Sequence, residues 1–407
     1  MERIEMISQH LKFKENPLIK SYYLCNDNTL VISEYRNGCR VIMLNRTNAL
    51  NSLVHDMILE LKRLLLEYRD DRDVKLVMIT SNSEKAFCAG GDLKNFSKLS
   101  LENPQGLNQF IRSEYSLDHI IHTYQKPIIS VVDGIVMGGG VGLSLHCNYR
   151  IVTERSLWAM PENMIGYFPD VGSTHFLSRL KHIGLYLALT GARLKYQDSM
   201  LVNIGTHFIP SGQNLHSLLN QLQTSDFINS FDEIDQILNT HCQSKTEIES
   251  NQSDILQHGD LISTCFNWDH KSFVDIYSSL QRYAQETVND LPTHQWISKL
   301  ITILDQSCPT SLMVCFENLH KAIHLPMELA IIDEIRVGSR IGIREDMRIG
   351  IDRVLNKSQQ VQKPYNPKHF TEVSNEFVQS FFDPLPIKGN ELIYDPIKRY
   401  MVSADSI

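Results

Sequence analysis

Short, continuous apolar runs alternate with stretches of helical periodicity through the first half of the chain, and this alternation limits the fold most strongly. Two runs, 29–35 and 39–45, flank a hairpin turn signal, Arg-Asn-Gly at 36–38. Later runs at 74–80 and 128–132 follow helical stretches. Because the runs are continuous rather than alternating, we expect an α/β fold with parallel strand pairs that are covered on both faces.

Helical spacing separates these apolar runs. Apolar side chains recur at helical spacing after a candidate N-cap at Asn51 or Ser52, namely Val54, Met57, Ile58, Leu61, Leu64, Leu65 and Tyr68. A second helix is predicted over about 106–124, and a further strand at 149–153. After about residue 175 strand-like runs disappear, and helical patterns continue to about residue 357.

The chain has 407 residues, which is long for one core and favours a large domain with appended parts. The predicted divisions are an N-terminal extension over 1–27, an α/β core over 28–225, a helical region over 226–357 and a tail over 358–407. A polar segment at 240–255 is predicted to be a loop. The tail contains several prolines, so we expect it to be irregular and to lie on the surface.

Charge and cysteine content exclude several classes of function. The formal net charge is −8 without a basic stripe, which argues against direct nucleic-acid recognition and leaves a peripheral place in a larger assembly open. The eight cysteines form no Cys-x-x-Cys pair, so neither a zinc knuckle nor a disulfide framework is indicated.

No uncharged apolar run reaches the length of a membrane span. Residues 1–20 mix acids with bases and are a poor match to a secretory leader or a transit peptide.

The segment Lys-Ala-Phe-Cys-Ala-Gly-Gly-Asp at 85–92 directly follows a predicted strand. Its adjacent glycines, Gly90 and Gly91, let a ligand approach the backbone closely and leave N–H groups unshielded. A plain strand-to-helix turn explains these residues about as well.

The glycine-rich segment 138–142 follows a predicted buried strand and opens a helix. Unpaired N–H groups at a helix start favour an anion, either a phosphate or a developing oxyanion. The next residue is Leu143, so the segment lacks the third glycine of the dinucleotide-binding pattern. Close packing of a helix on a strand is the alternative.

Two carboxylates, Glu162 and Asp170, each follow a proline on a short predicted loop. Such residues serve as nucleophile, base or acid, although by themselves they are more typical of solvated surface acids. Glu114 is by default a solvated helix side chain. His146 and His175 carry no catalytic signature and are interpreted as core or rim histidines.

Together these motifs, in this order and spacing, resemble the crotonase (enoyl-CoA hydratase/isomerase) family over about residues 28–210. Residues 44–51, Leu-Asn-Arg-Thr-Asn-Ala-Leu-Asn, resemble the strand end by which that family binds CoA, with Thr47 at the usual proline position. The resemblance implies a ClpP-like spiral of repeated ββα units, with two nearly perpendicular sheets and a helical C-terminal region over the acyl pocket.

Segments 85–92, 137–143, 160–172 and 307–312 are similar to the branch of that family that hydrolyses 3-hydroxyisobutyryl-CoA in valine breakdown. The resemblance therefore implies hydrolysis of a short 3-hydroxyacyl-CoA thioester to the free hydroxy acid and CoA. Hydratases of the family carry a glutamate where this chain has Gly142, which argues against water addition to a double bond.

The resemblance also assigns roles to individual residues. It implies an oxyanion hole from the N–H groups of Gly91 and Gly139, catalytic carboxylates at Glu162 and Asp170, and substrate contacts that include Glu114. The positions that match the family's CoA site are Arg46, Ala49, Lys85 and Phe87. No metal and no cofactor other than the CoA of the substrate are implied.

The resemblance implies that the binding partner is an acyl-CoA substrate and that the protein does not bind a membrane. It implies a mitochondrial location, and the alternative compartment is the cytoplasm. A homo-oligomer is left open.

Two alternative functions remain. Hydrolase-like chains of this branch also occur in the small subunit of mitochondrial ribosomes. Residues 349–352, Ile-Gly-Ile-Asp, replace the hydrolase's Glu-Gly-Val-Arg, and Tyr365 replaces a tryptophan, which favours such a non-catalytic role. The other alternative is hydratase or isomerase chemistry.

Overall fold

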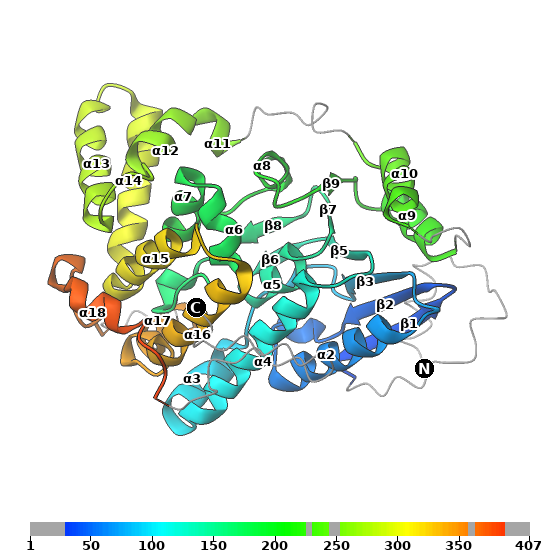
Figure 1. The fold of residues 1–407 in the computed structure, drawn as a ribbon. Helices are drawn as coiled ribbons and strands as arrows, with labels where there is room; N and C mark the ends of the chain where they lie inside the picture. Colours follow the sequence, from blue (N-terminus) through cyan, green and yellow to red (C-terminus); the bar gives the residue numbers. More distant parts are fainter. Residues whose placement is uncertain (1–28, 225–229, 244–252, 357–362, 387–407) are drawn as a thin grey trace.

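The larger of two sheets contains six strands in the order β1-β2-β3-β5-β7-β9 (Figure 1). The computed structural model describes residues 29–224, 230–243, 253–356 and 363–386. The strands of this sheet are β1 (Val31–Arg36), β2 (Cys39–Leu44), β3 (Leu76–Ser81), β5 (Ile128–Val132), β7 (Tyr149–Val152) and β9 (His207–Phe208). The β1–β2 hairpin is antiparallel, and the other neighbouring pairs are parallel. The predicted hairpin and five strand runs are confirmed to within two residues.

A second, three-stranded sheet agrees with the two sheets that the family resemblance implied, but the apolar runs did not predict its strands. It consists of β4 (Ala86–Cys88), β6 (Ile135–Met137) and β8 (Leu157–Ala159), in that order and all parallel. The expectation that strands end before about residue 175 is also wrong, because β9 pairs with β7. Strands of two or three residues are too short to show a period, so only pairing in the fold reveals them.

The larger sheet is covered on both faces, as the continuous apolar runs predicted. Helices α2 (His55–Asp70) and α4 (Pro104–His122) pack on one face, and α9 (Gln213–Thr224) and α10 (Phe231–His241) pack on the other (Figure 1). Alternate residues of β3 face the two cores: Val77 and Ile79 face the first, and Leu76 and Met78 face the second.

The region after β9 is helical in its described part, as predicted. Its α-helices before the tail, besides α9 and α10, are α11 (Asp254–Gln257), α12 (Gly259–Cys265), α13 (Phe273–Glu286), α14 (Leu291–Gln306), α15 (Pro309–Ala322), α16 (Met327–Ile341) and α17 (Glu345–Leu355). Between the strands lie α3 (Leu93–Glu102), α5 (Gly139–Leu145), α6 (Ser173–Arg179), α7 (His182–Thr190) and α8 (Tyr196–Leu201). Helix α16 packs on α4, and α17 packs on the short helix η3 (Glu162–Ile165). None of the helices in the described ranges has the length and apolarity that crossing a bilayer requires.

The described part of the tail, 363–386, is more ordered than predicted. It contains a turn of 3-10 helix, η5 (Phe370–Glu372), and the helix α18 (Asn375–Ser380). Aromatic side chains at Phe370, Phe381 and Phe382 are buried, so this described part of the tail packs against the core. The predicted extension over 1–27 and most of the loop at 240–255 lie outside the described residues. The four divisions remain predictions.

Candidate active site

Two pairs of glycines meet at one edge of the smaller sheet. Strand β4 leads to Gly90 and Gly91, and its parallel neighbour β6 leads to Gly138 and Gly139. Gly90 has φ of 93°, and a Cβ there would lie 3.1 Å from the carbonyl oxygen of Met137, so only glycine permits this approach. Among the described residues, no hydrogen bond uses the N–H of Gly91 or Gly139. Two backbone donors therefore remain available to a ligand.

Two buried carboxyl groups flank these donors. Glu114 lies on α4, and a Cβ placed on Gly139 would clash with its Oε1. Glu162 begins η3, and a Cβ on Gly138 would lie 2.9 Å from its Oε1. Within the part of the chain that the structure describes, Oε1 of Glu114 and Oε2 of Glu162 have no hydrogen-bond partner. The expectation that Glu114 is solvated by default is therefore wrong.

Asp170 joins this group from the loop before α6. The hydroxyl of Tyr115 donates to Oδ2 of Asp170 at 2.7 Å. The pKa of Asp170 is raised to about 7, because the effect of burial is larger than the opposite effect of the Tyr115 hydrogen bond. Burial, followed by the charge of Asp170, raises the pKa of Glu114 and of Glu162 well above the usual range. The three carboxyl groups are therefore not all ionised at neutral pH.

Two more buried acids near this group, Asp118 and Glu334, escaped the sequence analysis. Asp118 lies one helical turn after Glu114, and neither of its oxygens has a hydrogen-bond partner in the described ranges. Burial and then the charge of Glu114 raise its pKa well above the usual range. The spacing of four residues on a predicted helix is the signal that could have found Asp118. Glu334 lies on α16, and only the fold brings it to the site.

The turn that carries Asp170 has a strained backbone. Val171 has φ of 56°, a left-handed conformation that costs a β-branched residue about 1–3 kcal/mol. Nε2 of His146 donates to the carbonyl of Val171 at 2.7 Å, and the N–H of Gly172 donates to Oε2 of Glu334 at 2.7 Å. His146, interpreted from sequence as a core or rim side chain, therefore also holds this turn.

The four positions matched to CoA binding differ in their exposure. Arg46 forms an ion pair with Asp92 at 2.6 Å, so its guanidinium is already engaged by the chain. Ala49 is half-buried, and Lys85 is exposed. The side chain of Phe87 is fully buried, so only its backbone can face a ligand. A role of these four residues in CoA binding remains a prediction.

Residues 349–352 and Tyr365 differ from the hydrolase pattern, and Ile349 forms an apolar contact where that pattern has a charged residue. Ile349 packs with Cys308 and Tyr365, and Asp352 is exposed. The hydroxyl of Tyr365 donates to the carbonyl of Met164 at 2.8 Å, within η3. These residues support the short helix that begins with Glu162, and the changed charges remove no group from the carboxyl cluster.

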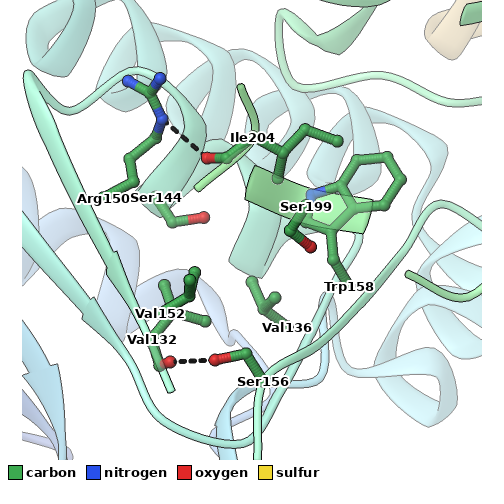
Figure 2. A pocket seen from close by; sticks show the side chains of 9 residues that line it. All are labelled: Val132, Val136, Ser144, Arg150, Val152, Ser156, Trp158, Ser199 and Ile204. Carbon is green, nitrogen blue, oxygen red and sulfur yellow. Dashed lines mark hydrogen bonds between the residues drawn. The ribbon is translucent and has the colours of Figure 1, made fainter. Parts of the chain in front are cut away.

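A separate small cavity lies between the two sheets (Figure 2). Its lining comes from β5 to β8, α5, α8 and the segments beside them: Val132, Val136, Ser144, Arg150, Val152, Ser156, Trp158, Ser199 and Ile204. The guanidinium of Arg150 is occupied by backbone carbonyls, including that of Ile204 at 2.8 Å. None of the predicted site residues lines this cavity, so the carboxyl cluster is the candidate active site.

Comparison with known proteins places the chain among proteins that act on CoA thioesters. The model of the family described as enoyl-CoA hydratase/isomerase matches residues 39–382. The chain is 32% identical to "3-hydroxyisobutyryl-CoA hydrolase, mitochondrial" of Gallus gallus, with 94% of each chain covered. It is 33% identical to the protein of the same name in Rattus norvegicus, with 95% of this chain and 94% of the relative covered.

Solved structures show the same fold. A carnitinyl-CoA dehydratase from Mycobacterium thermoresistibile aligns with a TM-score of 0.77 and 29% identity, covering 88% of this chain and 98% of that protein. An enoyl-CoA hydratase from Rhodobacter sphaeroides aligns with a TM-score of 0.75 and 27% identity over the same shares.

Proposed function

Because the chain belongs to the enoyl-CoA hydratase/isomerase family, we propose that its carboxyl cluster hydrolyses 3-hydroxyisobutyryl-CoA, in mitochondria, to 3-hydroxyisobutyrate and CoA. One observation carries the proposal. The N–H groups of Gly91 and Gly139, which no hydrogen bond uses within the described residues, lie at the same site as the carboxyl groups of Glu114 and Glu162, each of which has one oxygen without a hydrogen-bond partner there. The names of the relatives from Gallus gallus and Rattus norvegicus support the choice of substrate and compartment.

The two N–H donors suit the carbonyl oxygen of a thioester. When an oxygen nucleophile adds to the carbonyl carbon, the carbonyl oxygen becomes an anion that fixed donors stabilise without reorganisation. Removing one such donor typically lowers kcat by about 10²–10³. This assignment makes Gly91 and Gly139 the oxyanion hole.

Glu162 is the carboxylate that we assign to the thioester carbonyl, because its Oε1 lies against Gly138, next to the Gly139 donor. When ionised, it attacks the carbonyl carbon to give a mixed anhydride that water opens, or it removes a proton from an attacking water. On either route a C–O bond forms, the C–S bond breaks, and the CoA thiolate takes up a proton. Asp170, with its pKa raised to about 7, is suited to supply that proton or to orient the water.

Hydrolysis in ¹⁸O-water under single-turnover conditions tests for the anhydride route. An anhydride opened at the enzyme's acyl carbon leaves the label in Glu162. Direct attack of water, or opening of an anhydride at the substrate's acyl carbon, leaves the label only in the hydroxy acid. Mass spectrometry of the peptide that contains Glu162 and of the acid product reads both outcomes in one experiment.

The surroundings of Gly142 favour hydrolysis over hydration. In the resemblance described above, hydratases carry a glutamate at this position. Here a Cβ on Gly142 would lie 2.5 Å from Oδ1 of Asp118, so the chain has no room for a side chain without rearrangement. The buried Asp118 carboxyl therefore occupies space that a hydratase glutamate would need.

A thiol-release assay over a panel of acyl-CoA thioesters tests the function. We expect 3-hydroxyisobutyryl-CoA or 3-hydroxypropionyl-CoA to be cleaved best, with equal amounts of free thiol and hydroxy acid. Loss of the absorbance of an unsaturated acyl-CoA without thiol release would instead indicate hydration. If no short 3-hydroxyacyl-CoA releases thiol above background, the proposed function is wrong.

A further inference from the structure

The turn Asp170–Gly172 is held from two sides. Helix α16 contributes Glu334, whose Oε2 accepts from the N–H of Gly172 at 2.7 Å and whose Oε1 accepts from the N–H of Thr174 at 3.3 Å. The Thr174 hydroxyl donates to the same Oε1. Glu334 is fully buried, so these donors satisfy a carboxyl group that has no access to water.

The second contact comes from the end of α5, the helix that begins at Gly139. His146 follows the last residue of α5, and its Nε2 donates to the carbonyl of Val171 at 2.7 Å. The carbonyl can only accept, so the proton of a neutral His146 lies on Nε2. His146 therefore binds the carbonyl of Val171, and Glu334 binds the N–H of the next residue, Gly172.

Between these contacts lies the strained Val171, with φ of 56°. A buried β-branched residue adopts this conformation only where surrounding bonds enforce it. This φ lies between Asp170 and the N–H of Gly172 that Glu334 binds, so it fixes where Asp170 lies relative to that contact. Tyr115 donates to that carboxyl from α4, at the side of the cluster where Glu114 also lies.

We infer that Glu334 and His146 are positioning residues that hold the strained Val171 turn and so aim the Asp170 carboxyl at the reacting thioester. The catalytic part of this inference rests on the proposed hydrolase function. The structural part, that Glu334 holds the turn, depends only on its hydrogen bonds with Gly172 and Thr174.

The first arm of the test measures amide hydrogen exchange at Gly172 and Thr174 in the full chain. Glu334→Gln keeps the shape of the side chain, but its amide nitrogen cannot accept the second bond. The nitrogen faces either the N–H of Gly172 or the N–H of Thr174, and we expect exchange at that amide to accelerate roughly tenfold or more, because a protecting hydrogen bond is lost. Asp333→Asn on the same helix is the matched control, since Asp333 bonds Arg336 on α16, and exchange at Gly172 and Thr174 should not change.

The second arm measures 3-hydroxyisobutyryl-CoA hydrolysis by the same variants. Because misplacement of a reacting group by about 1 Å can cost about 10² in rate, we expect Glu334→Gln to lower kcat by roughly 10- to 100-fold, with KM changed by less than about threefold. Adding Val171→Gly should restore kcat by roughly fivefold or more, because glycine adopts positive φ without strain. A role only in stability would lower the melting temperature without this rescue.

Each outcome decides the inference. Faster exchange at Gly172 or Thr174 with reduced kcat and rescue by Val171→Gly supports it. Unchanged exchange at both amides overturns it, and so does faster exchange with wild-type kcat or with a reduced kcat that Val171→Gly does not rescue. If Glu334→Gln does not fold, the double variant with Val171→Gly is used for both arms. A wild-type chain that releases no thiol refutes the proposed function, and the exchange arm then decides by itself whether Glu334 holds the turn.

Discussion

Replacing Tyr115 with phenylalanine tests how the chain tunes Asp170, because the change removes one hydroxyl group. That hydroxyl donates to Oδ2 of Asp170 at 2.7 Å, and Tyr115 is fully buried. A hydrogen bond to a charged group contributes about 1.5–3 kcal/mol, and about 1.4 kcal/mol corresponds to one pH unit. The variant removes this stabilisation from the ionised carboxylate. The pKa of Asp170, raised to about 7 in the native chain, should therefore rise by a further 1 to 2, roughly.

The assay is the dependence of kcat on pH for 3-hydroxyisobutyryl-CoA. If Asp170 supplies the proton to the leaving thiolate, the alkaline limb of the profile should move to higher pH by the same amount. Tyr124→Phe is the matched control, since the buried Tyr124 donates to the carbonyl of Leu65 at 2.7 Å, in another part of the core. An alkaline limb that stays in place in a folded Tyr115→Phe variant would refute the assignment of that limb to Asp170.

Three other outcomes are expected. Gly139→Pro removes the oxyanion donor and should lower kcat by at least about 10², and near-normal kcat in a variant with an unchanged melting curve would place the oxyanion site elsewhere. Asp118→Asn should raise the melting temperature at about pH 8 but not at about pH 4, because the raised pKa of Asp118 makes stability fall as pH rises through that pKa. A stability change that is equal at both pH values would contradict this account. In a density gradient the chain should separate from ribosomal small subunits, and salt-resistant co-sedimentation would favour the ribosomal alternative.

The larger sheet could be predicted because burial on both faces leaves a continuous apolar run, as in Leu76–Ser81. The strands of the smaller sheet, which only the family resemblance implied, could not be located, because Ile135–Met137 has only three residues and its partners lie far away in sequence. The tail shows the opposite error: its prolines predicted an irregular segment, yet Phe370 and Phe381 bury against the core. The crotonase fold inferred from the motifs is confirmed by the solved structures that align with the chain.

In the candidate site, the sequence located the residues that lie on short motifs. Gly91, Gly139 and Glu162 were found because glycine pairs and a proline mark them, and the structure brings them together. The roles assigned to them remain proposals. Glu334 could not be found, because its contact with Gly172 joins residues 162 positions apart and no local pattern marks it. Nor does any sequence pattern show that Val171 has a positive φ.

The most direct test of the account compares 3-hydroxyisobutyryl-CoA hydrolysis by the wild-type chain and by Glu162→Gln. Free thiol and 3-hydroxyisobutyrate are measured together, so that hydrolysis is distinguished from other losses of substrate. Glutamine keeps the size of the side chain but can neither attack the carbonyl nor accept a proton from water. The account predicts equal release of both products by the wild type and a loss of at least about 10² in kcat for the variant. Wild-type turnover by a folded Glu162→Gln variant, or no thiol release by the wild type, would contradict it.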